Sequence, residues 1–120
     1  MANEFWDKKI ETISDKKLKE LQLDRLKKLV DYIYKKNKFY NKKLKDANIK
    51  PTDIKILNDI EKLPFLTKQD LRNYYPFGLV CTELDDIVEV HASSGTTGKP
   101  VVGPYTKADE ELWAEVMARS

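Results

Sequence analysis

The chain has 120 residues, of which 41% are hydrophobic and 35% are charged, and its formal net charge is +2. This length fits one ordinary domain or a piece of a larger one, and the apolar content is too high for a disordered chain. Its single cysteine, Cys81, excludes an intramolecular disulfide, and together with the single histidine it excludes a Cys/His metal cluster within the chain.

The opening residues and the hydropathy give no targeting or membrane signal. Met-Ala-Asn-Glu-Phe-Trp lacks the basic start and the apolar run of a signal peptide. No stretch approaches the roughly 18 apolar residues that a membrane-spanning helix needs. We therefore expect a cytoplasmic protein without a membrane partner.

Charge is unevenly distributed along the chain. Residues 1–50 contain 15 Lys and Arg against 8 Asp and Glu, a net of +7, whereas residues 51–120 contain 7 against 12, a net of −5. A basic half can bind nucleic acid or an anionic surface, but lysine is also a good helix former on a solvated face. Because acidic residues interrupt the basic ones, we favour the solvated face and expect no nucleic-acid partner.

A long amphipathic helix is predicted from Ser14 to Asn37, with Ser14 or Asp15 as its N-cap. Lysines fill most of its polar face. The apolar residues that recur at helical spacing and predict one buried stripe are Leu18, Leu21, Leu26, Leu29, Val30 and Ile33.

Shorter helical segments are predicted over 39–47, 58–62 and 68–75. Asn58 is placed to cap the second of these, which ends before a proline. Thr67, followed three residues later by Asp70, is typical of a capping box and predicts the start of the third.

A strand–loop–strand unit is predicted after residue 86. The β-prone run over 86–92 and the residues 101–105 are expected to flank a polar loop, residues 93–100. Gly103 and Pro104 weaken the second strand or place it at a sheet edge.

The last helix is expected to begin at Lys107 behind the N-cap Thr106. It is still running at Ser120, with no glycine or proline to stop it, which we interpret as a sign of truncation. Its apolar side is formed by Leu112, Trp113, Val116 and Met117.

The loop Ser93-Ser94-Gly95-Thr96-Thr97-Gly98-Lys99-Pro100 has the composition of a phosphate site. Its glycines allow positive φ and close approach of a ligand, its hydroxyls and backbone amides can donate to phosphate oxygens, and Lys99 adds a positive charge. The spacing excludes a Walker A loop, because two residues instead of four separate the glycines and Pro100 follows the lysine. A plain hairpin turn is the alternative that these features disfavour.

The segment resembles the phosphate-binding signature of the adenylate-forming enzymes, which include acyl-CoA synthetases, peptide-synthetase adenylation domains and luciferases. Within them, the surrounding residues are similar to the phenylacetate–CoA ligases, a branch that also lacks a lysine at Val101. The flanking segments that carry this resemblance are Val90-His91-Ala92, Tyr75-Pro76-Phe77-Gly78-Leu79, Leu63-Pro64-Phe65, Thr67 to Arg72, Trp113 to Ser120 and the helical stretch from Glu11 to Asp31. Pro104 departs from the usual run, in which glycine directly precedes tyrosine.

The resemblance implies an α+β or α/β fold, with a helical N-terminal region over 1–78 followed by the first strand–loop–strand of a larger adenylate-forming domain over 79–120. It implies the N-terminal segment of an aryl-acid–CoA ligase, which uses ATP, Mg²⁺ and coenzyme A. No catalytic or metal-binding residue is expected within these 120 residues, so the chain alone is expected to be inactive. The residues that it implies for binding the ATP phosphates are Ser94, Gly95, Thr96, Thr97, Gly98 and Lys99.

Alternative functions stay open. One is a related adenylating enzyme that acts on another substrate, and another is a non-catalytic module that binds through the basic helix. Unpaired strand edges also predict self-association or a homodimer. We interpret His91 as a strand residue and Cys81 as an ordinary thiol, without a catalytic role for either.

Overall fold

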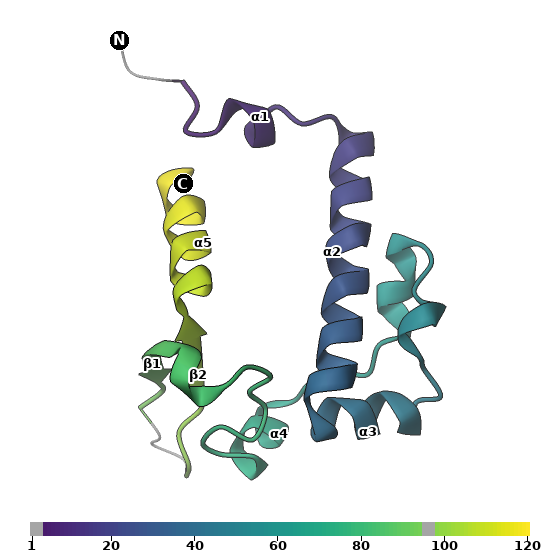
Figure 1. The fold of residues 1–120 in the computed structure, drawn as a ribbon, viewed down its shortest axis with the longest axis vertical. Coiled ribbons are helices and arrows are strands. Elements are labelled where there is room, and N and C mark those ends of the chain that lie inside the picture. The colour runs from purple at the N-terminus through teal and green to yellow at the C-terminus, as the bar shows by residue number, and fades with distance from the viewer. Residues whose placement is uncertain (1–3, 95–97) are drawn as a thin grey trace.

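The computed structural model describes residues 4–94 and 98–120, and its elements follow the predicted order of helices, hairpin and helix (Figure 1). The bounds are α1 Lys8–Glu11, α2 Asp15–Lys36, α3 Lys38–Asp46, η1 Pro51–Asp53, η2 Leu57–Lys62, α4 Lys68–Asn73, η3 Leu84–Asp86, β1 Ile87–Ala92, β2 Val102–Thr106 and α5 Lys107–Ala118, where η marks a 3₁₀ helix. The predicted fold class, a helical region followed by a strand–loop–strand unit, is confirmed. None of the described helices is long and apolar enough to cross a membrane.

The predicted long helix is confirmed as α2, with Ser14 as its N-cap. The helix ends at Asn37, whose side chain also starts α3 by accepting hydrogen bonds from the backbone N–H groups of Phe39 and Tyr40, at 2.9 and 3.3 Å. One residue therefore ends α2 and begins α3, so the two helices meet without a loop and pack against each other at a fixed corner.

A small core lies where α2, α3 and the 3₁₀ helices meet. Its buried residues are Val30, Leu44, Ile49 and Ile54, and the partly buried residues packed around them are Leu23, Leu26, Ile33, Tyr34 and Leu63. The predicted stripe on α2 is wrong in part, because Leu18 and Leu29 are exposed while Leu23 joins the core. The neighbouring elements cover only one side of the C-terminal half of α2, and apolar residues outside that contact stay in water (Figure 1).

Two predicted helix boundaries shift for local reasons. The η2 turn is capped by Asp59, whose carboxylate accepts from the backbone N–H groups of Lys55 and Ile56, whereas the predicted cap Asn58 lies exposed inside the turn. Thr67 and Asp70 form the predicted capping box, but α4 ends at Asn73, two residues before the expected Tyr75. In both turns the carboxylate binds the orphan N–H groups that a starting helix leaves.

The antiparallel hairpin β1–β2 begins with a register irregularity between Ile87 and Glu89. The second strand is confirmed one residue later than expected, because Val101 closes the loop instead. Its carbonyl accepts from the Ser93 N–H at 2.9 Å, and its own N–H donates to the Ser93 hydroxyl oxygen at 2.9 Å. These two bonds fix both ends of the loop before the ladder starts.

Helix α5 follows β2 directly, because Thr106 is both the last strand residue and the N-cap, in a capping box with Asp109. The helix ends at Ala118 rather than running through Ser120 as expected. In Figure 1, α2 and α5 stand on opposite sides of the molecule, with the hairpin and α4 at the same end as α3. Hydrogen bonds that link these sides include one from the Tyr32 hydroxyl to the Cys81 carbonyl and one from the Trp6 indole to the Glu115 carboxylate.

Candidate functional site

The candidate loop joins the two strands of the hairpin and projects from the end opposite to α5. Ser94, Gly98 and Lys99 are exposed, whereas Gly95, Thr96 and Thr97 lie outside the described residues. Gly98 has a φ of +118°, a conformation that residues with a Cβ rarely adopt. Among the described residues, and leaving aside its two chain neighbours, no heavy atom lies within 4 Å of the place where a Cβ would stand. The backbone, and not a lack of space, therefore makes glycine the residue of choice at this position.

The described end of the loop faces α4. Gly98 and Lys99 share a cavity of about 520 Å³ with Gln69, Arg72 and Asn73. The Lys99 ammonium lies 6.0 Å from the centre of the Tyr75 ring, at the outer limit of a cation–π contact. The structure thus brings Gly98 and Lys99 together with α4, a helix in which the sequence analysis predicted no binding residue.

The spacing of the α4 residues was the signal that could have revealed them. Gln69, Arg72 and Asn73 are related as i, i+3 and i+4, and therefore share one face of the helix. Asp70 lies off that face and binds Lys43 at 2.8 Å as well as the backbone N–H of Thr67. These bonds lower the pKa of Asp70 to about 2, and the bond from Lys43 has the largest effect. Asp70 is therefore a carboxylate at neutral pH, and the partners that it binds lie outside the cavity.

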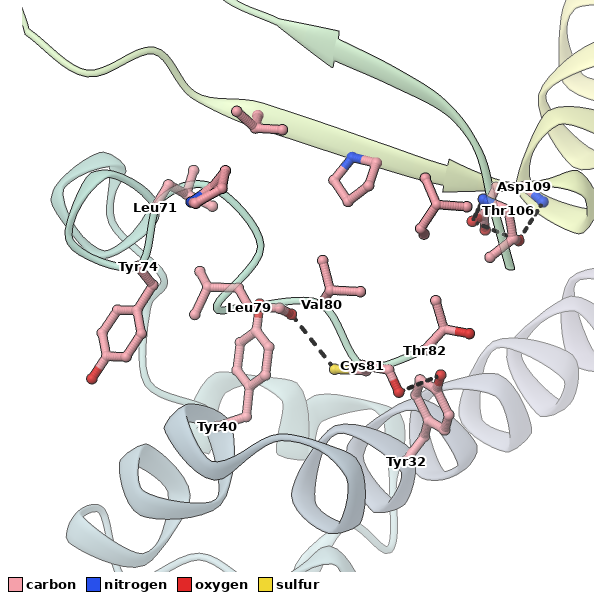
Figure 2. A pocket seen from close by; sticks show the side chains of 14 residues that line it. Tyr32, Tyr40, Leu71, Tyr74, Leu79, Val80, Cys81, Thr82, Thr106 and Asp109 are labelled. Atoms are coloured by element: carbon pink, nitrogen blue, oxygen red, sulfur yellow. Dashed lines mark hydrogen bonds between the residues drawn. The ribbon is translucent and has the colours of Figure 1, made fainter. Parts of the chain in front are cut away.

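A second cavity, of about 540 Å³, lies between the helical region and the hairpin (Figure 2). Tyr32 and Tyr40 border it from α2 and α3, and β2 borders it from the opposite side. Burial raises the pKa of the Cys81 thiol, which also borders this cavity. The thiol is therefore protonated at neutral pH, as fits the interpretation of Cys81 as an ordinary thiol.

His91 lies exposed on β1, as interpreted from the sequence, and contacts aromatic rings rather than a reactive group. Its ring packs edge-on against Tyr105, with centroids 5.2 Å apart, and lies 5.7 Å from Trp113. Its Nε2 atom pairs with the Glu89 carboxylate. The interaction between the Glu89 and Glu110 carboxyl groups lowers the pKa of Glu89 and raises that of Glu110.

Part of the positive charge of the basic helix α2 is paired within the helix. Three of its lysines pair one turn away with aspartates, Lys19 with Asp15, Lys28 with Asp24 and Lys35 with Asp31, at 2.7–2.9 Å. Such i,i+4 pairs add little to stability, but each neutralises a positive charge that could otherwise bind a nucleic-acid phosphate.

No protein-family model matches the chain. Similar curated proteins are the phenylacetate-coenzyme A ligase of Thermus thermophilus, 46% identical over 116 residues, and that of Escherichia coli, 44% identical over 111 residues. These matches include 97% and 92% of this chain. The chain spans only about a quarter of the length of these relatives, 26% and 25% respectively.

Similar solved structures are those of a 2-hydroxyisobutyryl-CoA ligase. The structure of that ligase with 2-HIB-AMP and CoA in the thioesterification state has a TM-score of 0.88 and 32% identity, and covers 98% of this chain and 26% of its own. A post-adenylation state with 2-HIB-AMP has a TM-score of 0.87 and 30% identity. The helical region and the hairpin of this chain therefore have the arrangement found in a quarter of a CoA ligase.

Proposed function

This chain is a relative of the phenylacetate-coenzyme A ligases that spans about a quarter of their length, and from that relationship we propose that it forms the N-terminal segment of an ATP-dependent aryl-acid–CoA ligase. The observation that carries the proposal is an identity of 40–46% over 92–97% of the chain, a stretch that includes nearly every element described above. The boundary near residue 78, between the helical region and the start of the ATP-binding domain, belongs to this proposal.

The proposed reaction has two steps. The carboxylate of phenylacetate attacks the α-phosphorus of ATP and displaces pyrophosphate, which gives an acyl-adenylate. The thiol of coenzyme A then attacks the acyl carbon, loses its proton and displaces AMP, which gives phenylacetyl-CoA. Catalysis of the first step is mainly positioning of the phosphates and neutralisation of their charge.

In this proposal the loop of residues 93–100 holds the β- and γ-phosphates of ATP. The positive φ of Gly98, the exposure of Ser94 and the cation of Lys99 support it, because they offer backbone and hydroxyl donors beside a positive charge. Mg²⁺ enters as the counter-ion of the phosphates, and the described residues group no three His, Cys, Asp or Glu side chains that could hold a metal themselves. Coenzyme A and the acid bind outside this chain, which by itself turns over no substrate.

A related ligase that activates another carboxylic acid is the second candidate. The observation in its favour is the similarity to the 2-hydroxyisobutyryl-CoA ligase, at a TM-score of 0.88. The two candidates share the loop and the adenylation step, and they differ in the acid alone. One experiment with several acids therefore tests both.

The test is acid-dependent exchange of labelled pyrophosphate into ATP by the product of the complete reading frame that contains this chain. We expect exchange with phenylacetate, and a loss of about five- to 150-fold in Gly98→Ala, because alanine at this φ costs about 1–3 kcal/mol of backbone strain. Gly103→Ala, in β2, is the matched control, since an added Cβ there makes ordinary contacts with the Tyr105 ring. Exchange with 2-hydroxyisobutyrate alone would favour the second candidate, and no exchange with any acid would refute both.

A further inference from the structure

The cavity between α4 and the candidate loop has the side chains of an anion site on both walls. Lys99 and the Gly98 backbone form one wall, and Gln69, Arg72 and Asn73 form the other. The two walls come from segments about 26 residues apart in sequence. None of the five residues around the cavity is acidic, and two of them carry a permanent positive charge at neutral pH.

One hydrogen bond joins the two amide side chains of the α4 wall. Gln69 donates from Nε2 to the Oδ1 atom of Asn73 at 2.7 Å, and this bond orients the two amides one turn apart. It uses the acceptor of Asn73 and leaves the NH₂ group of Asn73 to donate. Arg72 also borders the cavity, and its Nε atom is buried, so its side chain lies against the protein and does not extend into solvent.

The Asp70 carboxylate, the negative charge nearest in sequence, binds groups outside the cavity. Asp70 is the acidic residue on α4, and it binds Lys43 and the Thr67 backbone on another side of the helix. Helix α4 thus separates these two charges, because Asp70 pairs with Lys43 on α3 whereas Arg72 borders the cavity beside the loop. An anion in the cavity meets two cations without a competing carboxylate among the residues that border it.

We infer that α4 is the second wall of the phosphate site, where Arg72, with Asn73, binds the terminal phosphates of a polyphosphate chain opposite Lys99. Guanidinium binds two oxygens of one phosphate through parallel N–H donors, whereas the lysine acts as a point charge. This inference rests on the proposed function and deepens it, because it adds a binding residue from the helical region to a loop that the sequence presented as complete. It also gives that region a part in binding the nucleotide.

The experiment is an amide NMR titration of the ¹⁵N-labelled 120-residue chain with inorganic tripolyphosphate and, separately, with ATP. The backbone signal of Gly98 reports the loop wall, and the side-chain NH₂ signals of Gln69 and Asn73 report the α4 wall. We expect both sets to shift together with either ligand, because the polyphosphate is the part recognised. In Arg72→Gln, binding of tripolyphosphate should weaken about five- to tenfold, the size of one charged hydrogen bond partly exposed to water.

Two variants keep the result interpretable. Arg25→Gln removes the same charge from an exposed position on α2 and should leave the affinity for tripolyphosphate unchanged. Arg72→Lys retains the charge without the planar pair of donors and should restore part of the affinity. The unshifted amide signals of the α2–α3 core show that each variant stays folded.

The outcomes separate this inference from the function on which it rests. If Gly98 shifts but the α4 amides do not, and Arg72→Gln binds as the unaltered chain does, the loop binds phosphate alone and the inference fails. If neither wall responds to tripolyphosphate or ATP, both the inference and the assignment of the loop fail. Shifts of the α4 amides with ATP but not with tripolyphosphate would place the nucleoside there, and would also overturn it.

Discussion

Asn37 shows how much of this arrangement a single side chain can hold. It is 8% exposed, and its oxygen caps α3 while its amide nitrogen donates to the carbonyl groups of Gly78 and Val80 at 3.0 and 3.1 Å. It therefore joins the corner of the helical region to the segment that leads into the hairpin. A side chain without both an acceptor and two donors leaves at least one of these backbone groups without its partner.

Asn37→Ala should destabilise the chain by about 2–4 kcal/mol, since it removes a helix cap and two hydrogen bonds to part-buried carbonyls. Asn37→Ser keeps a cap oxygen and should lose less. The measurement is urea unfolding followed by far-UV circular dichroism. Asn58→Ala is the control, because Asn58 is exposed within η2 and should change stability by less than about 0.5 kcal/mol. Equal losses at both positions would contradict the assigned role of Asn37.

Asp70 predicts how stability depends on acid. Hydrogen bonds from Lys43 and Thr67 lower its folded-state pKa to about 2 from an ordinary 3.8, so the unfolded chain binds the proton first. Its contribution to stability is complete above pH 3.8 and is lost as the pH falls toward about 2.

The urea midpoint should fall over this interval, and it should fall less steeply in Asp70→Asn, which has no carboxylate to titrate. Asp59 titrates in the same direction, because the hydrogen bond from Lys62 and those from the backbone of Ile56 and Lys55 lower its pKa. The slope in Asp70→Asn should therefore be reduced and not abolished. Identical acid limbs in the two proteins would show that Asp70 is unpaired in solution.

At the scale of elements, α2 is amphipathic but only part of its apolar face is covered. The helix packs against α3 and the 3₁₀ turns through Leu26, Val30 and Ile33, whereas Leu29, one position before Val30, is 55% exposed. Burial, and not apolar character, decides what a residue contributes to stability, because only buried apolar area is removed from water. Val30 and Leu29, one buried and one exposed, are therefore a matched pair for measuring the effect of burial on stability.

Val30→Ala should cost about 2 kcal/mol, from lost contacts and the cavity that remains around a fully buried side chain. Leu29→Ala should change stability by less than about 0.5 kcal/mol, because its side chain is in water and alanine is the better helix former. Thermal or urea unfolding of the two variants gives the comparison. A large loss in Leu29→Ala would mean that its face of α2 is covered in solution.

The elements that were predictable from sequence are those specified by neighbours in the chain. The capping box at Thr67 and the N-caps Ser14 and Thr106 depend on residues three or fewer positions apart, so the sequence predicts them. The exposure of Leu29 and the position of α4 beside Lys99 depend on segments distant in sequence. Periodicity places a residue on a face of its helix, but it does not say whether another element covers that face. The composition of the loop predicts a phosphate site from sequence alone, whereas the position of α4 beside the loop can be known only from the folded structure.

The molecule as a whole is open and exposes much apolar surface. Its radius of gyration is 17.1 Å, against about 13.6 Å for a compact domain of this length. On α5, the apolar side chains of Leu112, Trp113, Val116 and Met117 are each 46–60% exposed, and Val88 and Val90 are similarly exposed on β1. Among the described residues, β1 pairs with β2 alone, so the hairpin also keeps free strand edges.

These surfaces favour self-association of the isolated chain, because contiguous apolar side chains and free strand edges are both sites of contact between copies. Sedimentation velocity should show species heavier than the 14.0 kDa monomer, in a proportion that rises with protein concentration. Leu112→Gln combined with Val116→Gln should shift the distribution toward monomer. Glu111→Gln, on the opposite face of α5, should leave it unchanged. If the double variant associates as strongly as the unaltered chain, the strand edges and not the α5 face hold the copies together. If the unaltered chain is fully monomeric, association through either surface is refuted.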